Sequence, residues 1–247
     1  MTGPDARARR AGVLMASALL VTAGLGACRA PAADGSTTST ASVAPPVSTP
    51  ALAAEAVQRI APLPAPEYFE TLTEEAFDAT PARLDAVIGQ ARAAASRDRA
   101  GLSVEAAATL DRRMAEIKTH RTPLNRADLA LSSIEAFRLF VAAIPASEPV
   151  PAAVSLLDYA GFRYVADLKA GPARWADAVL AADFAEARWL EIEARVTDPM
   201  LRQRFAGSVT ALKVSATARD TAAAMRAGQR ELDQVDELES FFARHPA

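Results

Sequence analysis

The stretch TPARLDAVIGQARAAA, residues 80–95, decides the fold class. Thr80 followed by Pro81 is typical of a helix N-cap with proline in the first helical position, where its missing N–H is not needed. Apolar side chains then recur at helical spacing, at Leu84, Val87, Ile88, Ala91 and Ala94. This pattern predicts an amphipathic helix that begins at residue 81 and buries one face against other helices.

The same signals recur along the chain to its C-terminal end. Pro151 and Pro172 precede apolar helical patterns, and we expect each to start a helix. No run of five or more residues from residue 66 onward alternates like a strand between turn signals. We therefore predict an all-α protein, a helical bundle over residues 66–247. The N-caps that we expect besides Thr80 are Ser103, Asn125, Asp198 and Asp220.

Two segments of the helical region resemble each other. PARLDAVIGQA begins at Pro81 and PARWADAVLAA begins at Pro172, and a tyrosine lies 13 residues before each proline. This similarity predicts two related four-helix units, residues 66–145 and 151–244. Convergence is the alternative, because alanine-rich helices that begin with proline look alike.

Gly161 lies in the middle of one expected helix. Glycine there costs about 1 kcal/mol relative to alanine, so a compensating reason is expected. Close crossing of two helices is the commonest such reason, and a kink or a ligand contact are the alternatives.

The N-terminal segment has the three parts of a secretory signal. Arginines occupy part of residues 1–10, no charge follows until Cys28, and small residues precede that cysteine. Leu25-Gly26-Ala27-Cys28 resembles the lipobox of bacterial lipoprotein precursors. The resemblance implies cleavage of residues 1–27 and attachment of a diacylglycerol to Cys28, whose new amine is usually acylated. An uncleaved membrane helix or a buried structural cysteine are the alternatives.

The segment that follows Cys28 has the composition of a linker. Residues 28–65 are rich in Ala, Pro, Ser and Thr, and such a stretch buries too little apolar surface to offset its ordering entropy. We expect a disordered tether that holds the helical domain off a membrane, outside the cytoplasm. Arg29 stands where the enteric sorting pattern has aspartate for inner-membrane retention, so the outer membrane is favoured in a Gram-negative host.

Composition and motifs narrow the functional classes. The 27 basic and 30 acidic residues do not provide the basic excess that nucleic-acid binding requires. The chain has two histidines, His120 and His245, and lacks haem-attachment, nucleophile-elbow and phosphate-loop motifs. We therefore predict no catalytic residue, no metal ligand and no cofactor. A pair of carboxylates could still perform acid–base chemistry, because such a pair has no local signature.

The second half contains the only cluster of candidate ligand-binding residues that we single out. Trp175 and Trp189 share one face of an expected helix, and Glu186 lies on the same side. If that face points inward, Glu186 is a buried carboxylate that needs a partner such as Arg138 or Arg163. Such a pocket could recognise a cation or an amine. The alternative is an apolar core stripe with glutamate at its edge. The full candidate set is Tyr159, Phe162, Trp175, Glu186, Trp189 and Arg138.

These observations predict a membrane-anchored extracytoplasmic lipoprotein with a non-catalytic binding or accessory domain. Its expected partners are the membrane, through the lipid, and an envelope protein or a small ligand. The acidic segment 230–242 is a solvated helix face or a docking surface for a basic partner. A carboxylate-dependent envelope enzyme and a structural envelope tether are the alternative functions.

The lipobox makes a direct prediction about the mature chain. Mass spectrometry of the protein isolated from its native membrane should find a chain that begins at Cys28 and carries covalent lipid. A chain that begins at Met1 with an unmodified thiol would contradict the anchor.

Overall fold

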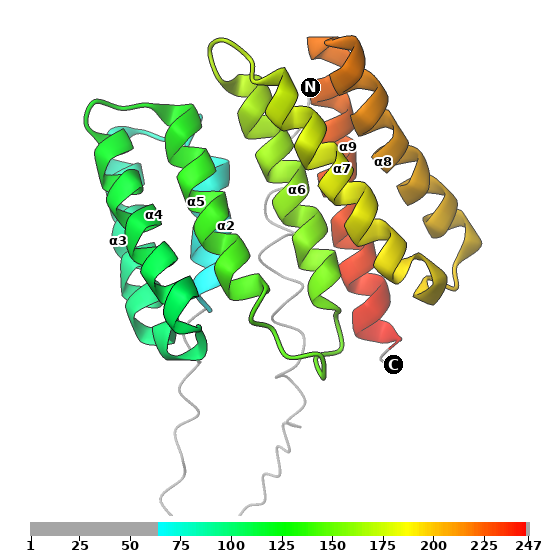
Figure 1. Cartoon of the computed structure of the whole chain (residues 1–247), viewed down its shortest axis with the longest axis horizontal. Helices are drawn as coiled ribbons and strands as arrows, with labels where there is room; N and C mark the ends of the chain where they lie inside the picture. The colour runs from blue at the N-terminus through cyan, green and yellow to red at the C-terminus, as the bar shows by residue number, and fades with distance from the viewer. Residues whose placement is uncertain (1–63, 246–247) are drawn as a thin grey trace, which may run out of the picture. The chain divides into compact units, whose positions relative to one another are not determined.

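The computed structural model describes residues 64–245, which form eight α-helices and two short 3-10 turns without any strand (Figure 1). The predicted all-α class is therefore confirmed for this part of the chain. The predicted signal sequence, Cys28 and nearly all of the predicted linker lie outside the described residues. The helices are α2 Ala65–Glu75, α3 Pro81–Asp98, α4 Val104–Arg121, α5 Arg126–Val141, α6 Ala152–Lys169, α7 Trp175–Ile192, α8 Pro199–Ala218 and α9 Thr221–Arg244.

Side-chain caps begin most of these helices where the sequence predicts them. The Thr80 hydroxyl accepts from the backbone N–H of Arg83, and the Asp198 carboxylate accepts from those of Met200 and Leu201. Each such cap contributes about 1 kcal/mol. The other confirmed caps are Ser103, Asn125 and Asp220.

The start of α7 differs from the prediction. The helix begins at Trp175 and not at Pro172, with Arg174 as its N-cap residue. The reason is a turn at the end of α6, where the Arg174 backbone N–H donates to the Asp167 carbonyl oxygen at 2.9 Å. The chain completes this turn before the next helix can begin, so Pro172 lies in the connection.

The eight helices form two groups of four that follow each other along the chain. In the first group α2 packs on α3 and on α5, and α4 packs on α5. In the second group α6 packs on α7 and on α9, and α8 packs on both of these. Helices α5 and α6 join the two groups side by side (Figure 1). The division into two related four-helix units and their origin by duplication stay predictions.

Helix α6 contributes to both hydrophobic cores. Leu157, Tyr164 and Leu168 pack into the core of α6–α9. Tyr159, Phe162 and Ala166 pack with α2–α5 in the other core. A helix that is apolar all round must be buried on all sides, and α6 meets this requirement by lying between the two groups.

Gly161 marks the place where α6 and α9 cross closely. A Cβ atom at residue 161 would lie 2.1 Å from Oε2 of Glu231 and 2.7 Å from Cδ2 of Leu232. Gly228 of α9 makes the reciprocal approach, since its Cβ would lie 2.8 Å from Cγ2 of Val165. Close crossing, the first of the three reasons considered for Gly161, therefore accounts for the glycine.

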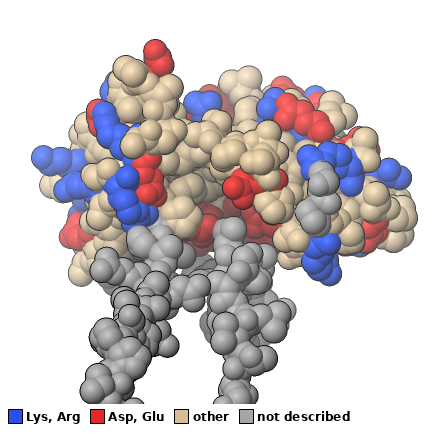
Figure 2. Space-filling model, turned by 90° about the horizontal axis from the view of Figure 1, so that it is seen from below, with Lys and Arg blue, Asp and Glu red and all other residues tan. Residues whose placement is uncertain are grey.

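The surface of the described domain carries both signs of charge. Figure 2 shows basic and acidic side chains interspersed over one face. Exposed pairs such as Arg83–Glu75 at 2.6 Å contribute at most about 1 kcal/mol each, so the two cores provide most of the stability. Among the helices of residues 64–245, none combines the length and the apolarity needed to cross a bilayer.

The helix crossing predicts a contrast between two glycine substitutions. Gly161→Ala should destabilise the domain by about 1–3 kcal/mol, because the new methyl group would displace the buried side chains of Glu231 and Leu232. Gly207→Ala is the matched control, since its Cβ on the exposed face of α8 meets nothing within 4 Å. It should stabilise the helix by up to about 1 kcal/mol. Urea unfolding of both variants measures the difference, and equal stabilities would contradict the close crossing.

Candidate functional site

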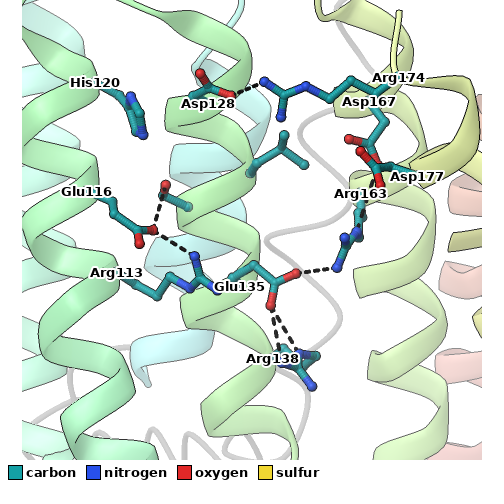
Figure 3. A pocket seen from close by; sticks show the side chains of 12 residues that line it. Arg113, Glu116, His120, Asp128, Glu135, Arg138, Arg163, Asp167, Arg174 and Asp177 are labelled. Atoms are coloured by element: carbon teal, nitrogen blue, oxygen red, sulfur yellow. Dashed lines mark hydrogen bonds and ion pairs between the residues drawn. The ribbon is translucent and has the colours of Figure 1, made fainter. Parts of the chain in front are cut away.

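A cavity of about 510 Å³ lies where helices α4, α5, α6 and the start of α7 meet (Figure 3). Its volume is within the range of small-molecule sites, but its lining is mostly ionisable. We call it the charged cleft. Its lining residues are Arg113, Glu116, His120, Asp128, Leu131, Ser132, Glu135, Arg138, Arg163, Asp167, Arg174 and Asp177.

Helical spacing places these side chains in the charged cleft. On α4 the lining residues follow each other at intervals of three and four, from Arg113 through Glu116 to His120. On α5 they recur in the same way from Asp128 to Arg138. Each helix therefore presents a polar stripe to the cavity and an apolar stripe to the core. Arg113 and Glu116 pair at 2.7 Å across one turn of α4.

Glu135 is the hub of the polar network in the charged cleft. Its Oε1 accepts from the Tyr159 hydroxyl at 2.7 Å and from Nη1 of Arg163 at 2.6 Å. Its other oxygen pairs with Nη2 of Arg138 at 3.2 Å. Glu135 is buried on α5, whereas Tyr159 and Arg163 belong to α6. A buried carboxylate with three donors is well satisfied, and it joins the two helix groups.

Tyr159 is a buried member of this network. Burial raises the pKa of Tyr159 to about 12, and the negative charge of Glu135 acts in the same direction. Its ring packs edge-on against Phe184 with 5.3 Å between centroids. The Arg138 guanidinium lies over the ring, 5.5 Å from its centroid. The phenol therefore keeps its proton and donates a hydrogen bond to Glu135.

Asp167 is the least satisfied acid in the charged cleft. Its side chain is 2% exposed, and its Oδ2 accepts no hydrogen bond. The nearest cation is Nε of Arg163 at 3.8 Å, too far for a hydrogen bond. Burial raises the pKa of Asp167 to about 7, against the attraction of Arg163 and with the added repulsion of Asp177. Asp167 is thus half protonated near neutral pH.

The turn before α7 closes the upper end of the charged cleft. Arg174 pairs with Asp128 of α5, so a residue of the α6–α7 connection reaches across to the first helix group. Figure 3 shows Asp177 beside Asp167 on the same wall. The late start of α7 leaves Arg174 in the connection, where its side chain can span the gap.

The structure brings only two of the six predicted ligand-binding residues to this site. Arg138 lines the charged cleft, and the Tyr159 hydroxyl donates a hydrogen bond to the lining residue Glu135. Trp189 is buried in the other core, where its ring lies 4.8 Å from that of Phe205. Trp175 packs at the edge of that same core, and Phe162 is buried against α2–α5. The four aromatic side chains therefore do not form one pocket.

Glu186 is not the buried carboxylate that the hypothesis of an aromatic ligand pocket requires. Its side chain is 48% exposed and pairs with Lys213 of α8 at 2.9 Å. Neither Arg138 nor Arg163 is its partner, since both bind Glu135. The tryptophan face of α7 points inward, but Glu186 lies far enough around the helix to reach solvent. This arrangement matches the alternative of an apolar core stripe with glutamate at its edge.

The two histidines occupy different places. His120 lines the charged cleft, whereas His245 stacks on Phe241 at the end of α9 with ring centroids 4.5 Å apart. Within residues 64–245, no three His, Cys, Asp or Glu side chains gather in a way that could hold a metal ion.

Sequence reasoning missed Glu135, Asp167 and Asp177. A signal was present, because Glu135 and Asp167 each interrupt a strongly apolar helical stretch. A carboxylate at such a position is buried at a cost unless it has partners.

Comparison with known proteins supplies no family for this chain: no protein-family model matches it, and no curated protein or solved structure does so either.

Asp167 predicts a particular pH dependence of stability. Its pKa in the folded protein is about 7, above the ordinary 3.8, so the folded state binds this proton more tightly than the unfolded state. The stabilisation of the folded state by this proton is present in full below about pH 3.8 and is lost as the pH rises to about 7. Between these pH values the free energy of unfolding falls by at most about 1.4 kcal/mol per pH unit.

Urea unfolding between these pH values measures this slope. Asp167→Asn should remove it and so gain stability relative to the parent protein as pH rises. Asp183→Asn, which changes an exposed acid paired with Lys213, is the control and should leave the slope unchanged. If the free energies of unfolding of the parent protein and Asp167→Asn depend on pH in the same way, the pKa of Asp167 is not raised.

Proposed function

We propose that the protein is a lipid-anchored extracytoplasmic binding protein whose helical domain holds a small charged ligand in the charged cleft. The observation that carries the proposal is the cleft itself. Four helices from both groups converge on a cavity large enough for a small molecule, and eleven of its twelve lining side chains are polar or charged.

The cost of this arrangement supports a functional role. Burying carboxylates such as Glu135 and Asp167 between two helix groups requires partners for each, and apolar side chains would join the groups at least as stably. Asp167 is left with an oxygen that accepts no hydrogen bond. A site that gives up stability in this way is typical of ligand recognition.

The membrane anchor is proposed from the sequence. The lipobox ends at Cys28, and the linker over residues 28–65 precedes the helical domain. Two or three acyl chains on one cysteine hold a protein at a membrane stably, whereas a single chain binds only marginally. The binding domain would then act at a membrane surface outside the cytoplasm, with an envelope protein as a further partner.

One observation favours a second function, an enzyme that uses a carboxylate. The pKa of Asp167 is raised to about 7 by burial, which suits a group that exchanges protons near neutral pH. Asp177 and His120 line the same cavity. If a ligand that binds is also converted, Asp167→Asn should abolish turnover and leave the fold intact.

Native mass spectrometry of the detergent-solubilised protein tests the binding function. We expect a small molecule to accompany the protein and, when added back, to stabilise it by about 2.7 kcal/mol at one hundred times its Kd. Arg113→Gln changes the charge of the lining of the charged cleft and should change that stabilisation. Arg204→Gln is the matched control, because Arg204 pairs with Glu237 on the surface at 2.5 Å. The proposal fails if no small molecule accompanies or stabilises the protein.

A further inference from the structure

We infer that the α6–α7 wall of the charged cleft binds the cationic nitrogen of its ligand, an organic ammonium group held between Asp167 and Asp177. This inference rests on the proposed binding function and names the chemical class of the ligand.

The first argument is the unsatisfied oxygen of Asp167. Its Oδ2 is shut off from water and accepts no hydrogen bond, while its carboxyl group lies in the wall of the cavity (Figure 3). A buried acceptor without a donor costs about 1–3 kcal/mol. An ammonium group carries three N–H donors and a positive charge, so it supplies what this carboxylate lacks.

The second argument is the balance of charge in the charged cleft. Five carboxylates face four arginines, and the arginines are already engaged. Arg113 pairs with Glu116, and Arg174 pairs with Asp128. The remaining two, Arg138 and Arg163, both bind Glu135.

The acids of the charged cleft that no cation hydrogen-bonds are Asp167 and Asp177. In the described part of the chain no ion pair joins Asp177, and the nearest guanidinium nitrogen to Asp167 is 3.8 Å away. Both acids lie on the same wall (Figure 3). A ligand that brings one positive charge to this wall restores neutrality, whereas an anion there meets two carboxylates.

Proton exchange gives this site a measurable signature. The charged groups that face Asp167 are Arg163 on α6, Arg174 and Asp177 at the start of α7, and Glu135 on α5. Burial and the negative charges of Asp177 and Glu135 raise the pKa of Asp167 to about 7, against the attraction of Arg163 and Arg174. An ammonium group favours the ionised carboxylate, so its binding should release part of a proton from Asp167.

Three probes of one chain length test the inference: 5-amino-1-pentanol, 1,5-pentanediol and 5-hydroxypentanoate. They differ only in one end group, which is cationic, neutral or anionic. Isothermal titration calorimetry of the full chain at pH 7 should show binding of the amine alone. Repetition in buffers of different ionisation enthalpy should show proton release.

Variants then locate the site. Asp167→Asn and Asp177→Asn should each weaken amine binding by about tenfold or more, and Asp167→Asn should also abolish proton release. Asp183→Asn, the exposed control, should change neither. Circular dichroism and thermal unfolding verify that the variants fold, and Asp177→Asn tests the site even if Asp167→Asn is unstable.

The outcomes separate the two proposals. Binding of 5-hydroxypentanoate but not of the amine overturns the inference and leaves the binding function standing. Amine binding that neither substitution weakens also overturns the inference alone. A native ligand that is a metal ion, or that contains no cationic nitrogen, has the same consequence. Absence of binding by all three probes overturns the inference, and absence of any co-purified or stabilising small molecule overturns the binding function as well.

Discussion

The burial of α6 on all sides is the constraint on which the rest of the structure depends. A helix that carries apolar residues around its whole circumference cannot lie on a surface, so it has to be shared by two cores. Leu157 and Tyr164 face one core, and Tyr159 and Phe162 face the other. Gly161 allows α9 to pack close enough to complete the enclosure. The two groups of helices are held together because both need α6.

Sharing one helix between two cores also creates the charged cleft. Where α6 leaves the apolar interface, Arg163 and Asp167 project toward the polar stripes of α4 and α5. Glu135 binds Tyr159 and Arg163, so the polar network and the apolar packing join the same two helices. A ligand that enters this cavity contacts both groups at once, and its binding would therefore affect how firmly they are held together.

The elements could be predicted from the sequence far better than the site. Thr80, Ser103, Asn125, Asp198 and Asp220 begin helices as expected, because an N-cap satisfies backbone N–H groups within a few residues of itself. The prediction that α7 begins at Pro172 was wrong, because a hydrogen bond from the Arg174 backbone N–H to the Asp167 carbonyl oxygen delays the start of the helix. The predicted aromatic pocket does not form, because the position of a residue around its helix does not determine which neighbouring helix that face contacts. Trp189 and Tyr159 consequently lie in different cores.

The amino-acid sequence by itself determined the helical class, the helix caps and the apolar stripes, since all of these depend on interactions between residues within a few turns of one another. Only the tertiary structure decided that Glu135 of α5 meets Tyr159 and Arg163 of α6, and that Arg174 reaches Asp128. Those pairs join residues 24 to 46 positions apart, and their partners follow from which helix faces come together. The charged cleft is a product of that packing, because no single helix contains it.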